Sequence, residues 1–338
     1  MTVLVIGGNR LVGPLVVERL VRRGCFVTVF NRGRRPAVYP AGVTHVTGDR
    51  RDLESLRRGS GRGRFDVVID MVAYDAADVA GIDEVFRGRI GQYVFVSSSF
   101  VYAVAATTAA PLVEGDIARP AIEARQLPAH RERAHAYGVN KRSAENWLGR
   151  HVDGVFPVTV LRPPYIVGET DLALLPSYVS RLLDGDPLIL PDGGSNVLNL
   201  AYAPDVAGAI DVCAGNPAVF GEVMNLGSRD VVTLRGLIAG IARRLGVEPR
   251  TVNIPSAVLT DQVDLTAFPC SYPFDLVLDS EKARRLIGYV PASIEDALHL
   301  SVPGVARAGG VPDEYHRNRP AEHHAIQRWA ERAGVVRL

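Results

Sequence analysis

The sequence predicts an α/β fold, a doubly wound parallel sheet followed by a smaller C-terminal α/β lobe. Short apolar runs typical of strands buried on both faces recur at 2–6, 26–30, 43–47, 67–72 and 93–96. Helical or polar segments separate these runs, which is the alternation expected of a parallel sheet. The first run leads directly into a glycine-rich turn and a helical pattern at 14–23.

The later elements divide the chain into two parts. A helical pattern at 137–148 and a strand at 158–161 complete the first part, so we expect residues 1–160 to form the sheet domain. Shorter, mixed helical patterns follow at 172–183, 204–213, 234–245, 280–286 and 293–300. We expect 161–338 to form mainly a substrate-binding lobe, with some elements returning to the first domain.

Two segments leave alternatives open. The stretch at 103–128 is rich in Ala, Thr and Pro and long for a loop, so it is either a substrate lid or poorly ordered. The polar stretch at 309–338 has a helical end at 326–333 and is either a docking tail or partly disordered.

Composition excludes several classes of function. The 338 residues are 47% hydrophobic and 22% charged, with a net charge of +1, so no overall basic field attracts nucleic acid or an anionic membrane. No apolar run reaches the ~18 residues of a membrane helix, and we expect a cytoplasmic protein. The three cysteines are far apart and form no CxxC, so neither a metal site nor a disulfide framework is expected.

The glycine-rich turn reads Gly7-Gly8-Asn9-Arg10-Leu11-Val12-Gly13. Glycine is needed where the backbone approaches a pyrophosphate, and the following helix offers free N–H groups and the positive end of its dipole. Because the turn joins a strand to a helix, it predicts a Rossmann dinucleotide site. The residues expected to contact the cofactor there are Gly7, Asn9, Arg10, Leu11 and Gly13.

The end of the second strand indicates which dinucleotide binds. NAD-binding units carry an acidic residue there for the ribose hydroxyls, whereas this chain has Asn31-Arg32. An amide followed by a guanidinium suits a 2′-phosphate, and Arg10 is placed to grip it from the other side. This favours NADP(H) over NAD(H). The alternative is that the arginines form a solvated turn and Asn31 itself holds the NAD ribose.

A tyrosine and a lysine four residues apart form the strongest catalytic signal. Tyr137 and Lys141 project from one face of the predicted helix. With 11 tyrosines and only two lysines in the chain, chance gives about 0.07 such pairs. An adjacent ammonium is expected to lower the phenol pKa toward neutrality, which suits acid–base catalysis. Upstream, the strand at 93–96 ends in Ser97-Ser98-Ser99, at the sheet edge where ligands bind.

Together these motifs resemble those of one family. The glycine turn, an SSxxVY-like strand end, YxxxK, then Leu161-Arg162-Pro163-Pro164 and Asp205-Val206-Ala207, are similar to the extended short-chain dehydrogenase/reductases, the NAD(P)-dependent epimerase/dehydratase family. The resemblance covers roughly residues 1–300.

The resemblance implies roles for individual residues. Ser98, four before Tyr102, is then the catalytic serine, Tyr137 the acid–base group and Lys141 its partner. Further cofactor contacts are expected at Asp49, Met71, Val72, Ala73, Ser97 and Pro163, as well as at Tyr137 and Lys141. Substrate contacts are expected at Tyr74, Ser99 and Tyr165. The family also implies a homodimer through the Tyr137 helix.

Departures from the family pattern narrow the function. Arg10 replaces the middle loop glycine, as in an atypical branch that includes chloroplast stem-loop RNA-binding proteins. Ser99-Phe100 stands where sugar-nucleotide 4,6-dehydratases carry Asp-Glu, which argues against dehydration. Leu198 replaces an arginine that epimerases use for the diphosphate, and 271–275 lacks a second one. A nucleotide-diphosphate substrate is therefore disfavoured, and Tyr165 indicates a more aromatic pocket wall.

We therefore expect a small-molecule oxidoreductase or epimerase. It would act on a hydroxyl or ketone carbon of a sugar-like compound or natural product by a Tyr-Lys-Ser mechanism. Freely exchanging NADPH would give a reductase, whereas retained NAD(H) would give an epimerase, and the sequence leaves both open. The alternative is a non-catalytic NAD(P)-binding regulatory or RNA-associated protein, for which the retained Ser98, Tyr137 and Lys141 have no explanation.

Overall fold

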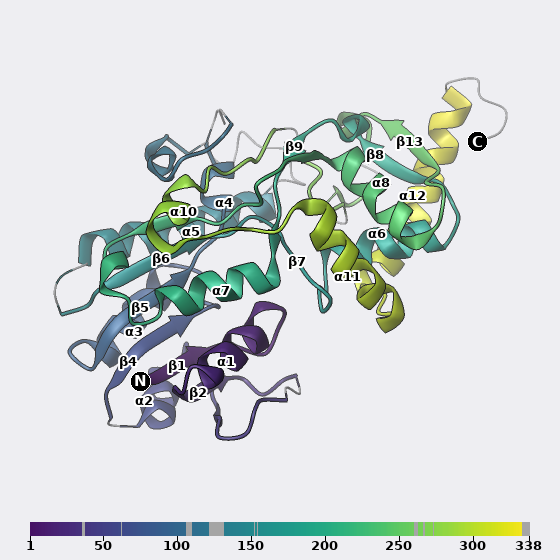
Figure 1. Ribbon diagram of the computed structural model, residues 1–338. Helices are drawn as coiled ribbons and strands as arrows, with labels where there is room; N and C mark the ends of the chain where they lie inside the picture. Colours follow the sequence, from purple (N-terminus) through teal and green to yellow (C-terminus); the bar gives the residue numbers. More distant parts are fainter. Residues whose placement is uncertain are drawn as a thin grey trace.

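A computed structural model shows a larger lobe built on one sheet and a smaller lobe beside it (Figure 1). It describes residues 1–338 except 36–37, 62, 106–109, 122–131, 152, 154, 260–262, 266–267, 273 and 333–338. Much of the 103–128 stretch, for which a lid was one alternative, thus lies outside the described residues. Within the described part of the chain, no helix is long and apolar enough to cross a membrane.

Seven parallel strands form the main sheet, in the order β11-β6-β5-β4-β1-β2-β3. The strands are β1 (Thr2–Ile6), β2 (Phe26–Asn31), β3 (Thr44–Thr47), β4 (Phe65–Asp70), β5 (Ile90–Val96), β6 (Val158–Arg162) and β11 (Val223–Asn225). The strand order reverses between β1 and β4, which opens a crevice at the carboxyl ends of these two strands. The predicted Rossmann fold class is confirmed.

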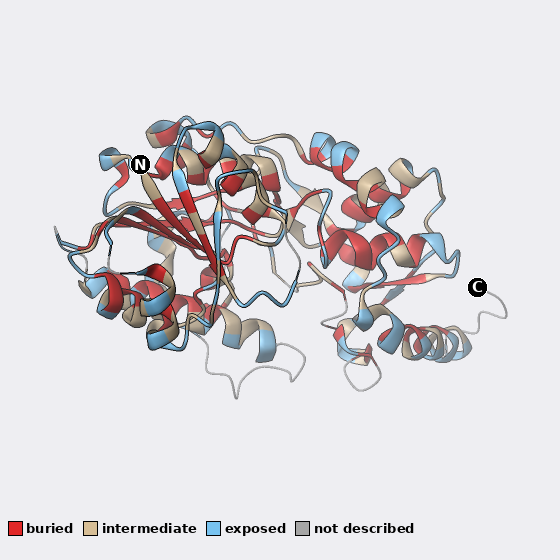
Figure 2. Cartoon of the chain, turned by 90° about the horizontal axis from the view of Figure 1, so that it is seen from below, coloured by how far each residue is buried: buried red, intermediate tan, exposed pale blue. Residues whose placement is uncertain are grey.

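Both faces of the sheet are covered by helices, and alternate residues of each strand serve opposite faces. In β1, Val3 and Val5 join the core beneath one helix layer, whereas Leu4 and Ile6 join the core beneath the other. Figure 2 shows the strands as the buried centre of the larger lobe. Continuous apolar runs are therefore typical of the central strands, whose two faces are both covered, whereas the edge strand β3 is largely exposed.

Helices from both halves of the sequence cover the sheet. The helices of this lobe are α1 (Val12–Arg22), α2 (Leu53–Ser60), α3 (Ala76–Phe86), α4 (Phe100–Ala103), α5 (Glu132–His151), α7 (Ala203–Cys213) and α10 (Glu281–Ile287). Helices α1, α7 and α10 pack on one face, and α2, α3 and α5 on the other. Strand β11 and helices α7 and α10 follow residue 160 yet belong to the larger lobe.

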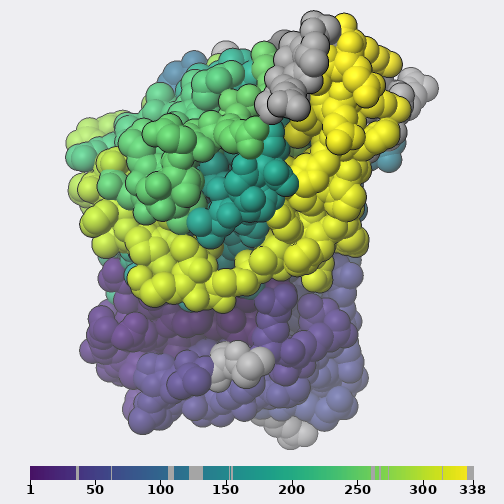
Figure 3. Space-filling model, turned by 90° about the vertical axis from the view of Figure 1, so that its right-hand side faces the viewer, coloured from purple at the N-terminus to yellow at the C-terminus, as the bar shows by residue number. Residues whose placement is uncertain are grey.

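The smaller lobe has its own apolar core, formed mainly by α6, α8 and α11. Its helices are α6 (Leu174–Leu183), α8 (Leu234–Leu245), α9 (Ser256–Leu259), α11 (Ile294–Ala308) and α12 (Asp313–Arg332). Its short strands are β7 (Ile166–Val167), β8 (Leu188–Pro191), β9 (Val197–Leu198), β10 (Ala201–Tyr202), β12 (Val232–Thr233) and β13 (Thr251–Ile254). Figure 3 shows the face of this lobe, with α12 in yellow along one side.

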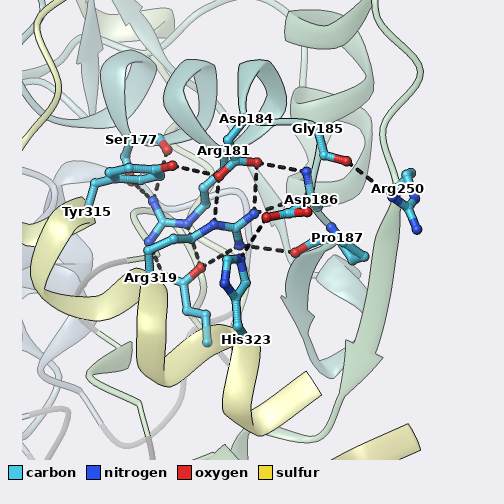
Figure 4. Close-up of polar contacts among 11 residues, drawn as sticks. Ser177, Arg181, Asp184, Gly185, Asp186, Pro187, Arg250, Tyr315, Arg319 and His323 are labelled. Atoms are coloured by element: carbon cyan, nitrogen blue, oxygen red, sulfur yellow. Dashed lines mark hydrogen bonds and ion pairs between the residues drawn. The ribbon is translucent and has the colours of Figure 1, made fainter. Parts of the chain in front are cut away.

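The C-terminal stretch is a docked helix over its described residues. Helix α12 packs against α6 through a buried ion pair in which Glu322 accepts from the Arg181 guanidinium, and neither side chain is exposed. Arg319 of the same helix donates to Asp184, and so does the Tyr315 hydroxyl (Figure 4). Residues 313–332 thus form a helix that is docked on the smaller lobe.

Replacing Glu322→Gln is expected to lower the free energy of unfolding by about 3–5 kcal/mol, because Arg181 would stay buried with one charge partner removed. Urea unfolding followed by circular dichroism measures the change. Glu331→Gln, at an exposed position of the same helix, is the matched control and should change stability by less than about 0.5 kcal/mol. A loss below about 1 kcal/mol for Glu322→Gln would contradict the role given to the pair.

Candidate active site

The site begins as a large cavity at the crevice between β1 and β4. Its volume is about 960 Å³, at the upper end of the usual range for cofactor pockets. Among the predicted cofactor contacts, its lining includes Gly7, Asn9, Arg10, Leu11, Asn31, Arg32, Asp49, Met71 and Val72. The other predicted contacts, Gly13, Ala73, Ser97, Tyr137, Lys141 and Pro163, do not line it.

Two glycines of the loop are required by its geometry. Gly7 has φ +102°, and a Cβ there would lie 2.8 Å from a methyl carbon of Val72. A Cβ on Gly13 would lie 2.5 Å from the Gly8 backbone, so this glycine lets α1 approach the loop. Helix α1 has no side-chain cap and no acidic residue in its first turn; the Gly13 N–H there donates to the Arg10 carbonyl and Pro14 has none, so an anion would meet mainly the positive end of the helix dipole. These residues fit a dinucleotide phosphate.

Several arginines gather beside the end of β2. Burial, followed by the nearby charges of Arg35 and Arg32, lowers the pKa of the Arg10 guanidinium. Arg10, Arg32, Arg34 and Arg35 all line the cavity. Like charges placed side by side repel one another unless an anion binds between them. This group of guanidiniums in the cavity wall is therefore suited to binding a phosphate.

The amide of Asn31 is fully engaged by the protein itself. Its nitrogen donates to the Gly7 carbonyl (3.0 Å) and to the Tyr39 hydroxyl (3.2 Å), and its oxygen accepts from the Gly33 N–H (2.9 Å) and contacts the His45 ring. These bonds fix the glycine loop against β2. The alternative in which Asn31 holds an NAD ribose would require some of them to break.

A buried charge network that the sequence analysis missed supports the cavity floor. Asp70 accepts from Arg50 (2.7 Å) and from the N–H groups of Val72 and Ala73 (2.9 and 2.8 Å). Arg50 also pairs with Asp78. The turn made by Asp70 ends β4 at this residue, so the strand predicted at 67–72 extended two residues too far. The signal that could have placed the end of β4 is Asp70 itself, because its carboxylate interrupts the apolar run.

The predicted catalytic groups come together at the ends of β5 and α5. The Ser98 hydroxyl lies close enough to the Tyr137 phenol to lower its pKa. The Lys141 ammonium donates to the Ala73 carbonyl (2.7 Å) and the Val96 carbonyl (3.0 Å), which tie α5 to β4 and β5. Their arrangement brings an acid–base phenol, a hydroxyl and an ammonium to one edge of the sheet.

The pKa of Tyr137 differs from the expectation. Burial raises the pKa of Tyr137, and the nearby Ser98 hydroxyl opposes part of that rise. The sequence predicted instead that the Lys141 ammonium would lower this pKa. The physical reason is that Lys141 is committed to two main-chain carbonyls and lies 5.9 Å from the Tyr137 ring centroid. Burial also lowers the pKa of Lys141 from 10.5 to about 8, against the opposing charge of Asp70.

The Ser97 hydroxyl belongs to a buried hydrogen-bond network. This hydroxyl donates to Glu145, which also accepts from the Arg162 guanidinium. Arg162 donates to the Tyr102 hydroxyl (2.6 Å), which donates to Asn225 (2.7 Å). The Ser97 hydroxyl is therefore part of a buried network joining β5, α5, β6, α4 and β11, and the cofactor contact predicted for this residue stays a prediction.

The predicted substrate contacts have different surroundings. The Tyr74 and Tyr137 rings lie 5.7 Å apart, and Tyr165 lies 6.0 Å from Phe100. Ser99 is fully buried, its N–H donates to the Pro163 carbonyl, and its hydroxyl has no hydrogen-bond partner within the described part of the chain. Such burial does not favour the substrate contact predicted for Ser99. Among the described residues, no group of acidic, histidine or cysteine side chains could hold a metal ion.

Comparison with known proteins identifies the family. A model of the NAD dependent epimerase/dehydratase family matches residues 3–227. The chain belongs to this family. It is 28% identical to 2′-dehydrokanamycin reductase of Streptomyces kanamyceticus, over 79% of this chain and 73% of that protein. It is 26% identical to the chloroplast stem-loop binding protein of 41 kDa b of Arabidopsis thaliana, over 86% and 75% of the two chains.

A third relative and two solved structures complete the comparison. A 4-hydroxy-2-methyl-3-oxo-4-farnesyl-3,4-dihydroquinoline-1-oxide ketoreductase of Stigmatella aurantiaca is 25% identical, over 86% of this chain and 92% of that one. The UDP-glucose 4-epimerase of Thermotoga maritima superposes with a TM-score of 0.74 at 20% identity, covering 92% and 100% of the two chains. The Bacillus cereus UDP-glucuronic acid 4-epimerase with NAD gives 0.70 at 17%, covering 91% and 97%.

The buried ammonium of Lys141 predicts a pH-dependent stability. Its folded pKa of about 8 lies below its unfolded value, so between these values the unfolded chain binds more protons and raising the pH stabilises the fold. From about pH 7.5 to about pH 9.5, the wild type should gain about 2 kcal/mol relative to Lys141→Met. Urea unfolding of the cofactor-free proteins measures this gain. A stability difference that stays constant with pH would contradict it, and Lys282→Met is the control.

Proposed function

We propose that this protein is an NADP(H)-dependent oxidoreductase that reduces a ketone of a small natural product to a secondary alcohol. The observation that carries the proposal is the group of arginines at the end of β2, formed by Arg10, Arg32 and Arg35. Guanidinium groups bind a 2′-phosphate by charge-assisted hydrogen bonds, and Asn31 replaces the carboxylate that a 2′-hydroxyl would need. An exchangeable NADPH suits net reduction.

The chain supplies distinct groups for the cofactor and the proton. The glycine loop and the α1 N-terminus would hold the pyrophosphate, and Arg10, Arg32 and Arg35 the 2′-phosphate. When bound, the dinucleotide supplies the hydride donor or acceptor. The Tyr137 hydroxyl donates a proton to the ketone oxygen, and Ser98, whose hydroxyl acts on the Tyr137 phenol, orients that oxygen.

The ionisation state of the site suits reduction. Because burial raises the pKa of Tyr137, its phenol carries the proton at neutral pH. Lys141, whose pKa is about 8, is mainly charged at pH 7, and its ammonium, bound to the Ala73 and Val96 carbonyls, holds the helix that carries Tyr137 against the sheet. Two relatives are named as reductases of a natural product, which supports the same direction. The homodimer and the cytoplasmic location stay predictions.

Replacing Arg10→Gln together with Arg32→Gln is expected to weaken NADPH binding by about 10–100-fold, because both changes remove charge-assisted bonds to the phosphate. NADH binding should change by less than about threefold. Titration followed by nicotinamide fluorescence measures both dissociation constants. Arg150→Gln, at an exposed site on α5, is the control. Wild-type protein that retains NAD and prefers NADH would overturn the reductase proposal in favour of an epimerase.

Tyr137→Phe should lower kcat by about 10²–10⁴-fold, because the proton donor is lost, while NADPH binding is retained. Loss of absorbance at 340 nm with a panel of ketones measures the rate, and fluorescence titration measures binding. Tyr315→Phe, on α12, is the control and should keep wild-type kcat. Retained activity in Tyr137→Phe would refute the proposed proton donor. A wild type that binds neither dinucleotide would favour the non-catalytic alternative and make binding to a stem-loop RNA the next assay.

A further inference from the structure

Six aromatic rings form a connected group around the proposed proton donor. The Phe100 ring lies 5.6 Å from Tyr137, 6.0 Å from Tyr165 and 5.5 Å from Tyr272. The group is completed by two further contacts, Tyr74 with Tyr137 at 5.7 Å and Tyr272 with Phe274 at 5.3 Å. We call Tyr74, Phe100, Tyr137, Tyr165, Tyr272 and Phe274 the ring cluster.

Exposure distinguishes the ring cluster from the apolar core. All six residues are partly exposed, whereas core tyrosines such as Tyr93 and Tyr102 are at most 1% exposed. Both lobes contribute, because Phe100 lies on α4 of the larger lobe and Tyr272 packs against the core of the smaller lobe. Partly exposed rings that meet between two lobes, around an acid–base group, are typical of a ligand-binding surface.

The two positions at which an arginine would grip a diphosphate carry no basic side chain, which disfavours a diphosphate ligand at the ring cluster. Leu198, at the position where an arginine would grip a diphosphate, is 3% exposed and pairs with Leu276. The described residues of 271–275 include no basic side chain.

A cationic ligand is disfavoured for a different reason. Asp171 is the acidic group that interacts with Tyr165, and it already accepts hydrogen bonds from the N–H groups of Ala173 and Leu175. Burial raises the pKa of Tyr165 and of Tyr272, so both phenols stay neutral. The ring cluster therefore presents uncharged aromatic faces and edges.

We propose that the ring cluster binds a flat, uncharged aromatic ring of the substrate beside the carbonyl that is reduced, with Phe100 as the residue that determines this specificity. The proposal rests on the proposed function and adds the class of substrate. Phe100 contacts three of the other five rings, including Tyr137, so a ligand ring in contact with Phe100 lies close to the proton donor. Aromatic rings prefer edge-to-face and offset contacts at about 4.5–7 Å, the spacing found within the cluster.

Three methyl ketones test the proposal. They are 4-phenyl-2-butanone, 4-cyclohexyl-2-butanone and 4-(piperidin-4-yl)-2-butanone, which share one carbonyl environment but carry an aromatic, an aliphatic and a cationic ring. With NADPH, kcat/KM for the phenyl ketone should exceed that for the cyclohexyl ketone about tenfold. In Phe100→Leu, which keeps an apolar side chain, this ratio should fall to about twofold or less. Phe220→Leu, far along the sequence and 37% exposed, is the control and should keep the wild-type ratio.

The outcomes separate the ring proposal from the proposed function. Equal kcat/KM for the phenyl and cyclohexyl ketones would overturn the ring proposal and leave the reductase intact, and so would an unchanged ratio in Phe100→Leu. A preference for the piperidine ketone would show a cation-binding cluster instead. If no ketone is reduced, each ketone is titrated into the protein with NADP⁺ and its binding is followed by calorimetry. Selective binding of the phenyl ketone would support the ring proposal without the reductase. Absence of binding would overturn both.

Discussion

A buried ion pair between Glu145 and Arg162 holds the candidate active site together. Glu145 lies on α5, the helix that carries Tyr137 and Lys141, and Arg162 ends β6. The pair joins that helix to the carboxyl edge of the sheet, where Ser98 follows β5. Both charges are nearly inaccessible to water, so each depends on the other and on the hydroxyls of Ser97 and Tyr102 for compensation.

The spacing on α5 explains why one helix can serve both catalysis and structure. Tyr137, Lys141 and Glu145 follow one another at intervals of four residues, so they share the face turned toward the sheet. From one end to the other, that face offers a partly exposed phenol, an ammonium bound to the Ala73 and Val96 carbonyls, and a carboxylate in the core. An arginine at position 141 would place a larger, always charged group where a compact ammonium fits.

The sequence was sufficient for the features that depend on local pattern. Strand runs, the glycine loop and the Tyr137–Lys141 spacing are encoded within a few residues, and the fold class and family follow from them. Features that depend on distant partners were not accessible. Two such features are the pairing of Arg181 with Glu322 and the network of Arg50 with Asp70 and Asp78. Predicting them requires knowledge of which distant segments of the chain meet. The hydrogen bond from Ser97 to Glu145 is likewise beyond local pattern, because the two residues are 48 positions apart.

The same limitation explains the error over the pKa of Tyr137. A lysine four residues away predicts electrostatic stabilisation of the phenolate, but sequence spacing contains no information on desolvation. In the folded chain, burial acts on both groups and in opposite directions, raising the pKa of the phenol and lowering that of the ammonium. From ordinary values of 10.0 and 10.5, the two pKa values therefore move apart, and the ammonium becomes the more acidic of the two groups. The neutral phenol of Tyr137 would therefore keep its proton until a ligand oxygen basic enough to accept it lies against the hydroxyl.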